Sequence, residues 1–216
     1  MGMWSVTVWL IVINVVVYVL NGLSDDLLAQ LGYFSASTAI YHLQVWRFIT
    51  FQFLHASFSH IFFNMLALYF FGPLIEGYLG SRRYLAFYLL CGTAGAGMYL
   101  ILWALGLLHA GAQTPLIGAS AGIFGVLVAA AKIAPDATVM LLFPPIPMKL
   151  KVMAWIMIAI AVFTVFGNGR NAGGEAAHLG GAALGALLIW RPQLLNVFTM
   201  WPPKPRKRRF FGDDWR

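Results

Sequence analysis

Six long runs of apolar residues, separated by short polar stretches, set the pattern of this chain. A transmembrane helix needs about 20 mostly apolar residues to cross a hydrocarbon core of about 30 Å. The pattern therefore predicts six membrane-spanning helices, at 4–20, 58–78, 84–105, 120–134, 152–167 and 176–190. The fourth is short and rich in Gly and Ala, so we expect it to be surrounded by protein rather than lipid. No small-residue cleavage site follows the first, so we expect it to be retained.

The composition agrees with a membrane protein. Of the 216 residues, 61% are hydrophobic and 10% are charged, whereas a soluble domain has about 45–50% apolar and about 25% charged residues. Too few polar side chains are present to cover a water-facing surface, which excludes a soluble enzyme, a disordered chain and a disulfide scaffold. The single cysteine, Cys91, lies in an apolar run and cannot form an internal disulfide.

The distribution of Lys and Arg predicts how the spans are oriented. Twelve of the 14 basic residues fall on one side of the membrane if both termini do, and only Arg47 and Arg170 fall on the other. By the positive-inside rule both termini are then cytoplasmic, and we expect a bacterial inner (plasma) membrane. The net charge of +7 follows from this topology and requires no nucleic-acid partner. The basic tail at 201–216 is either a solvated flank or a contact with anionic lipid headgroups.

A long segment, 21–57, separates the first two spans on the non-cytoplasmic side. It has no run long enough to cross the bilayer, yet it is rich in Leu, Phe, Tyr and Trp. Such a segment is typical of an amphipathic element lying in the membrane interface. The sequence thus predicts a single-domain, all-α membrane protein, in which six transmembrane helices form a bundle with a long interfacial loop between helices 1 and 2.

Ser120 is the first candidate for chemistry, because polar groups within membrane spans are costly unless they are used. It lies in Gly-Ala-Ser-Ala-Gly at the start of the fourth span, where unpaired backbone N–H groups are suited to binding an oxyanion. Alternatively, these small residues only allow close helix packing. The same letters match the nucleophile elbow of soluble hydrolases. That interpretation requires a strand before the serine, where we expect a loop, and Glu175 lies only three residues before His178.

His178 is the second candidate. It lies about one helical turn from Gly181, and Gly181 and Gly185 form a small-residue face that lets another helix approach closely. We expect this face to meet the fourth span, whose Gly122 and Gly125 offer a matching surface. The serine and this histidine both lie near the non-cytoplasmic ends of their spans, and a Ser–His pair at hydrogen-bond distance is a nucleophile with its base. A lone membrane histidine would instead make a hydrogen bond between helices.

His60 and Asn64 form the third candidate. Their spacing of four residues places both on one face of the second span, at the depth of Ser120. Both can donate to an oxyanion, and the alternative is a packing hydrogen bond. The sequence has no His-Glu-x-x-His motif and no two aspartates within spans, which argues against zinc and aspartyl proteases. We expect no metal or other cofactor, and we interpret the loop residues His42 and His109 as solvated or interfacial.

Four motifs, taken in order, make this chain resemble the rhomboid family of intramembrane serine proteases. They are Trp46-Arg47, His60-x-x-x-Asn64, Gly118-Ala119-Ser120 and Ala177-His178-x-x-Gly181-x-x-x-Gly185. The resemblance covers about 4–192 and implies a Ser120–His178 dyad without an acidic third member. It also implies an oxyanion hole made by the Ser120 backbone N–H, His60 and Asn64. Structural roles are implied for Trp46, Arg47, Glu76, Gly118, Gly181 and Gly185.

Two residues depart from the pattern of that family. Ala121 follows the serine where the family often has Gly, and Phe124 stands where an aromatic residue, commonly Tyr, occurs. A Phe can still pack against the His178 ring but lacks the hydroxyl. Neither change removes a reacting group.

These inferences predict a serine-type intramembrane endopeptidase at 1–200. Its expected substrates are the transmembrane segments of single-span or other membrane proteins, cut near the non-cytoplasmic face. We expect the protein to be embedded in the lipid bilayer and to need no obligate protein partner. The rival interpretation is a catalytically silent rhomboid-like protein that binds client helices, which would be expected to lack the serine or the histidine. A small-solute transporter would show paired membrane charges or inverted repeats, and we find neither.

Overall fold

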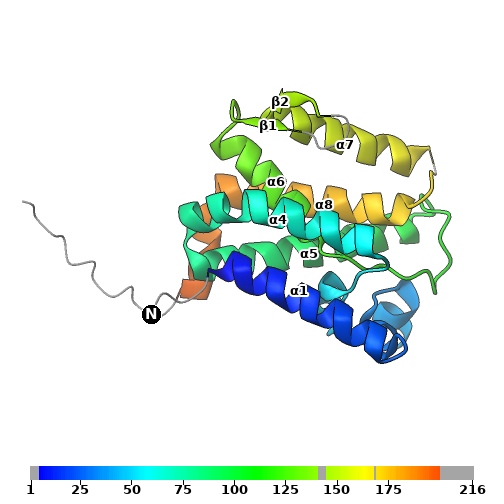
Figure 1. Ribbon diagram of the computed structural model, residues 1–216. Helices are drawn as coiled ribbons and strands as arrows, with labels where there is room; N and C mark the ends of the chain where they lie inside the picture. Colours follow the sequence, from blue (N-terminus) through cyan, green and yellow to red (C-terminus); the bar gives the residue numbers. More distant parts are fainter. Residues whose placement is uncertain (1–4, 141–144, 168, 200–216) are drawn as a thin grey trace, which may run out of the picture.

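The computed structural model describes residues 5–140, 145–167 and 169–199, and six long helices dominate it (Figure 1). They are α1 (Val6–Leu23), α4 (Phe58–Leu79), α5 (Ser81–Ala104), α6 (Ser120–Ile133), α7 (Leu150–Phe166) and α8 (Ala172–Trp190). Within the described residues, four are long and apolar enough to cross a membrane, namely α1, α4, α5 and α8. The other two, α6 with 14 residues and α7 with 17, are apolar but shorter. The predicted all-α membrane bundle is confirmed, with each predicted span matched by one helix.

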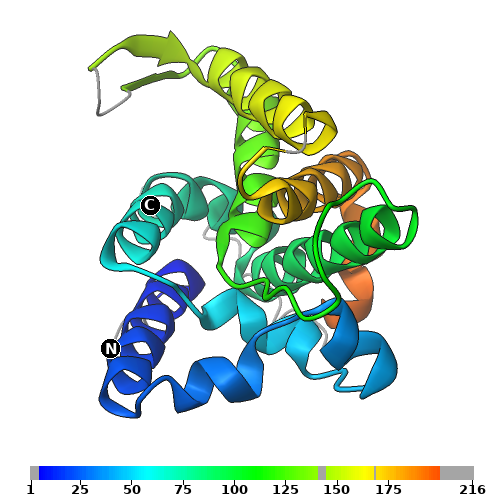
Figure 2. The ribbon, with the colours of Figure 1, turned by 90° about the vertical axis from the view of Figure 1, so that its right-hand side faces the viewer.

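The bundle is arranged around α8. This helix packs against α5, α6 and α7, while α4 packs against α1 and α6. Figure 2 looks nearly along the helices and shows α7 at the edge of the bundle, beyond α6 and α8. The first and last described residues lie at the same end of the molecule (Figure 1), as an even number of spans requires.

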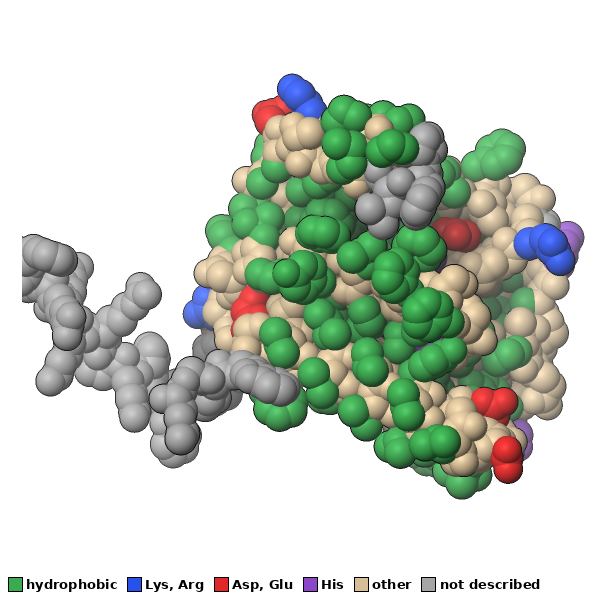
Figure 3. Space-filling view, viewed as in Figure 1, with side chains coloured by type: hydrophobic (Ala, Val, Ile, Leu, Met, Phe, Trp, Pro, Cys, Tyr) green, Lys and Arg blue, Asp and Glu red, His purple; other side chains and the backbone are tan. Residues whose placement is uncertain are grey.

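The outer surface of the bundle is apolar. Large hydrophobic side chains are strongly exposed on several helices, including Phe70, Trp155 and Phe163 at 61%, 71% and 81%. Hydrophobic side chains are spread over the middle of the face seen in Figure 3, and most of the charged side chains lie toward its edges. Such a surface is unstable in water and matches a hydrocarbon solvent.

The segment between α1 and α4 folds into short helical pieces. These are α2 (Leu27–Gly32), a π-helix η1 (Ser37–Tyr41), α3 (Arg47–Thr50) and a 3₁₀-helix η2 (Phe51–Phe53). The buried Arg47 guanidinium donates to the carbonyl oxygens of Gln30 at 2.9 Å and Tyr33 at 2.6 Å. Trp46 Nε1 donates to the Leu31 carbonyl at 3.3 Å. The Trp-Arg motif thereby ties α3 to the end of α2.

Glu76 holds the start of α1 against α4 and α5. Its carboxylate accepts hydrogen bonds from the backbone N–H groups of Val6 at 2.8 Å and Thr7 at 2.9 Å. The Thr7 hydroxyl donates to it at 2.8 Å and the Ser81 hydroxyl at 2.7 Å. A carboxylate at a helix N-terminus satisfies N–H groups that have no partner within the helix. Glu76 therefore joins the ends of three helices.

A short antiparallel hairpin joins α6 to α7 and was not predicted. It pairs β1 (Thr138–Met140) with β2 (Pro147–Lys149). Strands of three residues are too short to produce a recognisable alternation. Beside the hairpin, Asp136 accepts hydrogen bonds from the Nζ atoms of Lys149 at 3.1 Å and Lys151 at 2.9 Å, which lower the pKa of Asp136. After α8, a 3₁₀-helix η3 (Pro192–Thr199) follows, and the predicted basic tail lies outside the described residues.

Helices α6 and α8 approach each other through small residues. A Cβ atom on Gly181 would overlap the Ala121 carbonyl oxygen, and one on Gly185 would lie 2.5 Å from Gly125 Cα. The prediction of close contact holds for Gly125, whereas the prediction for Gly122 is wrong. A Cβ at position 122 would meet the Tyr88 ring of α5 at 2.9 Å. Residues four apart share a helix face, so 121 and 125 face α8 together while 122 is rotated away.

Candidate active site

Ser120 is the first residue of α6, directly after a loop that requires glycine. Gly118 has a φ of 128°, a backbone conformation that residues other than glycine rarely adopt. A Cβ on Gly118 would also lie 2.8 Å from His60 Nε2. Gly118 thus lets the chain turn into α6 while His60 of α4 lies against the turn. The N–H groups of the first turn of α6 have no partner within the helix and face outward.

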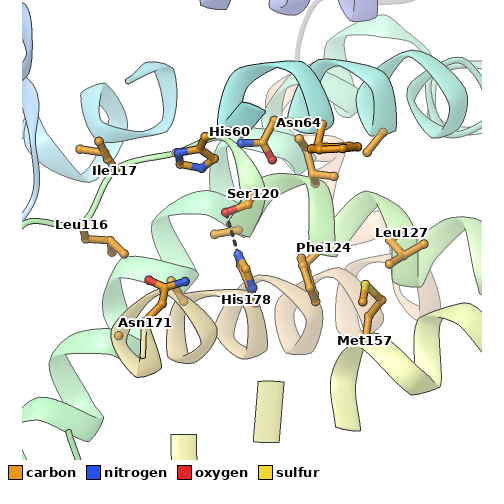
Figure 4. A pocket seen from close by; sticks show the side chains of 18 of the residues that line it. His60, Asn64, Leu116, Ile117, Ser120, Phe124, Leu127, Met157, Asn171 and His178 are labelled. Atoms are coloured by element: carbon orange, nitrogen blue, oxygen red, sulfur yellow. Dashed lines mark hydrogen bonds between the residues drawn. The ribbon is translucent and has the colours of Figure 1, made fainter. Parts of the chain in front are cut away.

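The Ser120 hydroxyl is in hydrogen-bond contact with His178, which lies in the second turn of α8. The Ser120 Oγ and His178 Nε2 atoms are 2.7 Å apart, as the dashed line in Figure 4 marks. The Phe124 ring stacks on the imidazole, with ring centroids 4.1 Å apart and planes 9° from parallel. This is the packing expected of a Phe at that position. From the same helix, Ser120 therefore contacts the Nε2 atom of His178, and Phe124 contacts the face of its ring.

His60 and Asn64 bring donor groups from α4 to the same place. Both side chains point toward the Ser120 region in Figure 4. The Asn64 side chain is buried, and its Nδ2 has no hydrogen-bond partner among the described residues. His60 Nδ1 accepts a bond from the Ala56 backbone N–H at 3.4 Å, so in the neutral ring Nε2 carries the hydrogen. Two side-chain donors thereby face the serine from one helix.

A large cavity opens at this site. Its volume is about 1460 Å³, above the roughly 300–1000 Å³ of typical small-molecule pockets. Ser120, His178, His60 and Asn64 all line it, together with apolar side chains of α4, α6, α7 and β1. The cavity therefore runs between α4 and α7 from the serine to the hairpin, and its size suits a segment of polypeptide.

His55 is a buried group near the site that sequence reasoning did not single out. It lies just before α4, its side chain is buried, and its ring centroid is 4.9 Å from that of His60 in an edge-on arrangement. Burial and, secondarily, the neighbouring His60 lower the pKa of His55 to about 3. The residue is therefore neutral at physiological pH. A loop histidine is usually solvated, so only the spacing of five from His60 hinted at contact.

Glu175 is a second neighbour that sequence reasoning passed over. Its Oε2 lies 2.9 Å from His178 Nδ1, the ring nitrogen that does not face Ser120. By chain order alone, Glu175 is only an acid too near His178 to fit a soluble hydrolase. The helical spacing of three residues was the signal that pointed to a contact.

Comparison with known proteins agrees with this architecture. The family model of the rhomboid domain matches residues 42–192. Rhomboid protease AarA of Providencia stuartii is 28% identical over 93% of this chain and 78% of its own length. Rhomboid protease GlpG of Serratia proteamaculans is 28% identical over 85% of this chain and 61% of its own. The mitochondrial rhomboid protein 1 of Saccharomyces cerevisiae is 33% identical over 64% of this chain, which spans 39% of that longer protein.

The fold and the site define a helical membrane protein with a serine and a histidine in contact at the end of a short inner helix. The match covers well over half of the chain, from the interfacial segment to the end of α8. The protein belongs to the rhomboid family.

Proposed function

We propose that this protein is a serine-type endopeptidase that cleaves the transmembrane segments of membrane-anchored proteins. The observation that carries the proposal is the contact of 2.7 Å between Ser120 Oγ and His178 Nε2 at the wall of a segment-sized cavity. A serine hydrogen-bonded to a histidine base is the basic arrangement of an activated nucleophile. Membership of a family that includes named rhomboid proteases supports the same activity.

The reaction begins when Ser120 Oγ attacks the carbonyl carbon of a client peptide bond. His178 Nε2 takes the hydroxyl proton, and the carbonyl oxygen becomes an oxyanion. The Ser120 backbone N–H, Asn64 Nδ2 and His60 Nε2 are the donors proposed to bind it. His178 then gives the proton to the leaving amine, the C–N bond breaks and an ester on Ser120 remains. A water molecule then gives a proton to His178 and attacks the ester carbon; the C–O bond to Ser120 breaks, His178 returns the proton to Ser120 Oγ, and the carboxylic acid product leaves.

The position of Ser120 also determines which client transmembrane segments can be cleaved. A client helix hides its carbonyl groups in its own hydrogen bonds, so a segment has to unwind before Ser120 can attack it. Unwinding is costly in lipid because the freed backbone groups have no partners there. Helix-breaking Gly or Pro residues near the cut lower that cost. The small residues around Ser120 and His178 favour a small side chain, such as Ala, just before the cut.

The placement in the membrane remains part of the proposal. With both termini cytoplasmic, the first residues of α6 and α8 face the non-cytoplasmic side, which is where cleavage is expected. We propose a multi-pass protein of a bacterial plasma membrane. Some relatives are named as mitochondrial proteins, so membership of the family does not fix the membrane.

The test uses the full chain reconstituted in lipid vesicles, with a fluorophosphonate probe and a single-span model substrate carrying Ala before the scissile bond. Wild type is expected to label at Ser120 and to cut the substrate. Ser120→Ala and His178→Ala are each expected to abolish cleavage, and the double variant to lose little more, because the two act as a unit. A folded wild type that neither labels nor cuts would instead support the alternative, a silent protein that binds client helices.

A further inference from the structure

Glu175, His178 and Ser120 form one continuous hydrogen-bonded chain. Glu175 lies in the first turn of α8, and its spacing of three residues places it on the same face as His178. Glu175 Oε2 is 2.9 Å from His178 Nδ1, and His178 Nε2 is 2.7 Å from Ser120 Oγ. Each ring nitrogen of the histidine therefore has one oxygen partner.

The partner of Nδ1 decides which nitrogen can act as the base. An ionised carboxylate only accepts hydrogen bonds, so the Nδ1 atom that faces Glu175 has to carry the hydrogen. A neutral imidazole has only one N–H group, and Nε2 is then left with its lone pair directed at Ser120. This is the tautomer that can take the serine proton.

We propose that Glu175 is a positioning residue that fixes His178 in this tautomer and stabilises the imidazolium formed when Ser120 gives up its proton. The proposal rests on the function proposed above and deepens it. It also departs from what the family resemblance implied, a pair of residues with no acidic third member. Glu175 acts only through His178, while Ser120 and His178 touch the reacting atoms.

The surroundings make the charge of Glu175 effective. The Glu175 and His178 side chains are 19% and 14% exposed, so water and salt screen the pair less than they screen a surface ion pair. The Phe124 ring stacks on the imidazole and limits its rotation. The histidine is thus held at its face by Phe124 and at its Nδ1 edge by Glu175, which leaves Nε2 aimed at the serine.

A different role for Glu175 is a favourable charge at the N-terminus of α8. An acidic side chain in the first turn of a helix stabilises the helix by interacting with its dipole. That role needs no contact with His178 and predicts a change in stability without a change in turnover. The two roles therefore separate experimentally.

The experiment measures kcat, KM, the rate of fluorophosphonate labelling and the unfolding temperature of the reconstituted full chain. Glu175→Gln removes the charge at nearly constant shape, and Glu175→Ala removes the hydrogen-bond partner altogether. Asp136→Asn is the matched control, since it removes an acidic charge that is ion-paired on the surface, away from His178. The substrate is the single-span segment cleaved by wild type.

Both Glu175 variants are expected to lower kcat by about 100-fold or more, the scale of a general-base contribution, and to slow labelling. In both Glu175 variants, KM should stay within about two-fold of the wild-type value and the unfolding temperature should match wild type. The Asp136→Asn control should match wild type in kcat, KM and labelling rate. Unchanged kcat in both Glu175 variants, with an active wild type, overturns this proposal alone. A kcat loss that follows the loss of folded protein overturns it as well, because it assigns Glu175 to stability. An inactive, unlabelled wild type overturns the proposed function and this inference together.

Discussion

The backbone of Gly181 lies so close to the carbonyl oxygen of Ala121 that no side chain fits between them. Ala121 is the residue after Ser120, and Gly181 is one turn beyond His178. The width of this contact therefore sets the distance between the serine hydroxyl and the imidazole. A structural glycine on one helix controls the geometry of two polar groups that it does not touch.

Replacement of Gly181 by Ala should consequently abolish most activity. The added methyl group has to push α8 away from α6, and a misplacement of about 1 Å costs about 100-fold in rate. The matched control is Gly97→Ala in α5, where a Cβ would meet nothing within 4 Å. Cleavage assays on both variants, together with their unfolding temperatures, check this expectation. Full activity in Gly181→Ala would show that the helices adjust without moving the serine.

The proposed oxyanion donors should affect turnover more than labelling. Loss of one such donor typically costs about 100- to 1000-fold in kcat. Asn64→Ala should fall in that range, because Asn64 Nδ2 is buried with no partner among the described residues. His60→Ala should also lower kcat. Single-turnover cleavage measures the effect, and normal turnover in both variants would remove α4 from the chemistry.

Glu76 should matter for stability and not for the chemical step. It accepts four hydrogen bonds, three from the start of α1 and one from Ser81 at the start of α5, and a hydrogen bond to a charged group contributes about 1.5–3 kcal/mol. Glu76→Ala is expected to lower the free energy of unfolding by at least about 2 kcal/mol, while the folded fraction keeps its kcat. Ser81→Ala, which removes only one of the four bonds, should cost less. Equal losses in the two variants would contradict the anchoring role.

The buried His55 should make stability depend on pH. Its pKa of about 3 in the folded chain lies below the unperturbed value of about 6.5, so below pH 6.5 the unfolded state binds a proton that the folded state does not. The contribution of His55 to the free energy of unfolding is fully present above pH 6.5 and is lost as the pH drops toward 3. At pH 5 the loss is about 2 kcal/mol.

The measurement compares unfolding at pH 7.5 and pH 5 in wild type, His55→Gln and His42→Gln. The His55 variant should lose this part of the pH dependence. The His42 variant should keep it, because His42 lies on the exposed surface of the interfacial segment. An identical pH dependence in wild type and His55→Gln would mean that His55 titrates normally in the folded chain.

Much of the fold follows from the sequence because hydrocarbon imposes simple rules. A run of apolar residues long enough to cross the bilayer has to be helical, since no water satisfies its backbone, and this fixes α1, α4, α5 and α8. The meeting of Ser120 with His178 follows from two further constraints, their common depth and the small residues beside each. The depth of a residue in the membrane and the size of the residues beside it can both be predicted from the sequence, without knowing which helices pack together.

The remaining features depend on details that periodicity does not contain. The choice between Ala121 and Gly122 as the residue that faces α8 depends on the rotation of α6 about its axis. Composition favours neither, and the expectation for Gly122 was wrong. Chain order does not indicate the contact of Glu175 with His178, which only their helical spacing of three residues predicts. His55 lies in a loop, where histidines are usually solvated, and its burial depends on neighbours that the local sequence does not specify.

The shortness of α6 has a consequence for the lipid around the protein. Its 14 residues span about 21 Å, so it falls about 9 Å short of a hydrocarbon core of about 30 Å. A helix exposed to lipid would compensate for such a hydrophobic mismatch by thinning the bilayer around it. Because α4, α5 and α8 pack around α6, protein rather than lipid surrounds the short helix, and loop residues that precede Ser120 line the cavity next to it. Under the proposed function, a client backbone would reach Ser120 through this cavity, and the surrounding bilayer would not have to thin to admit it.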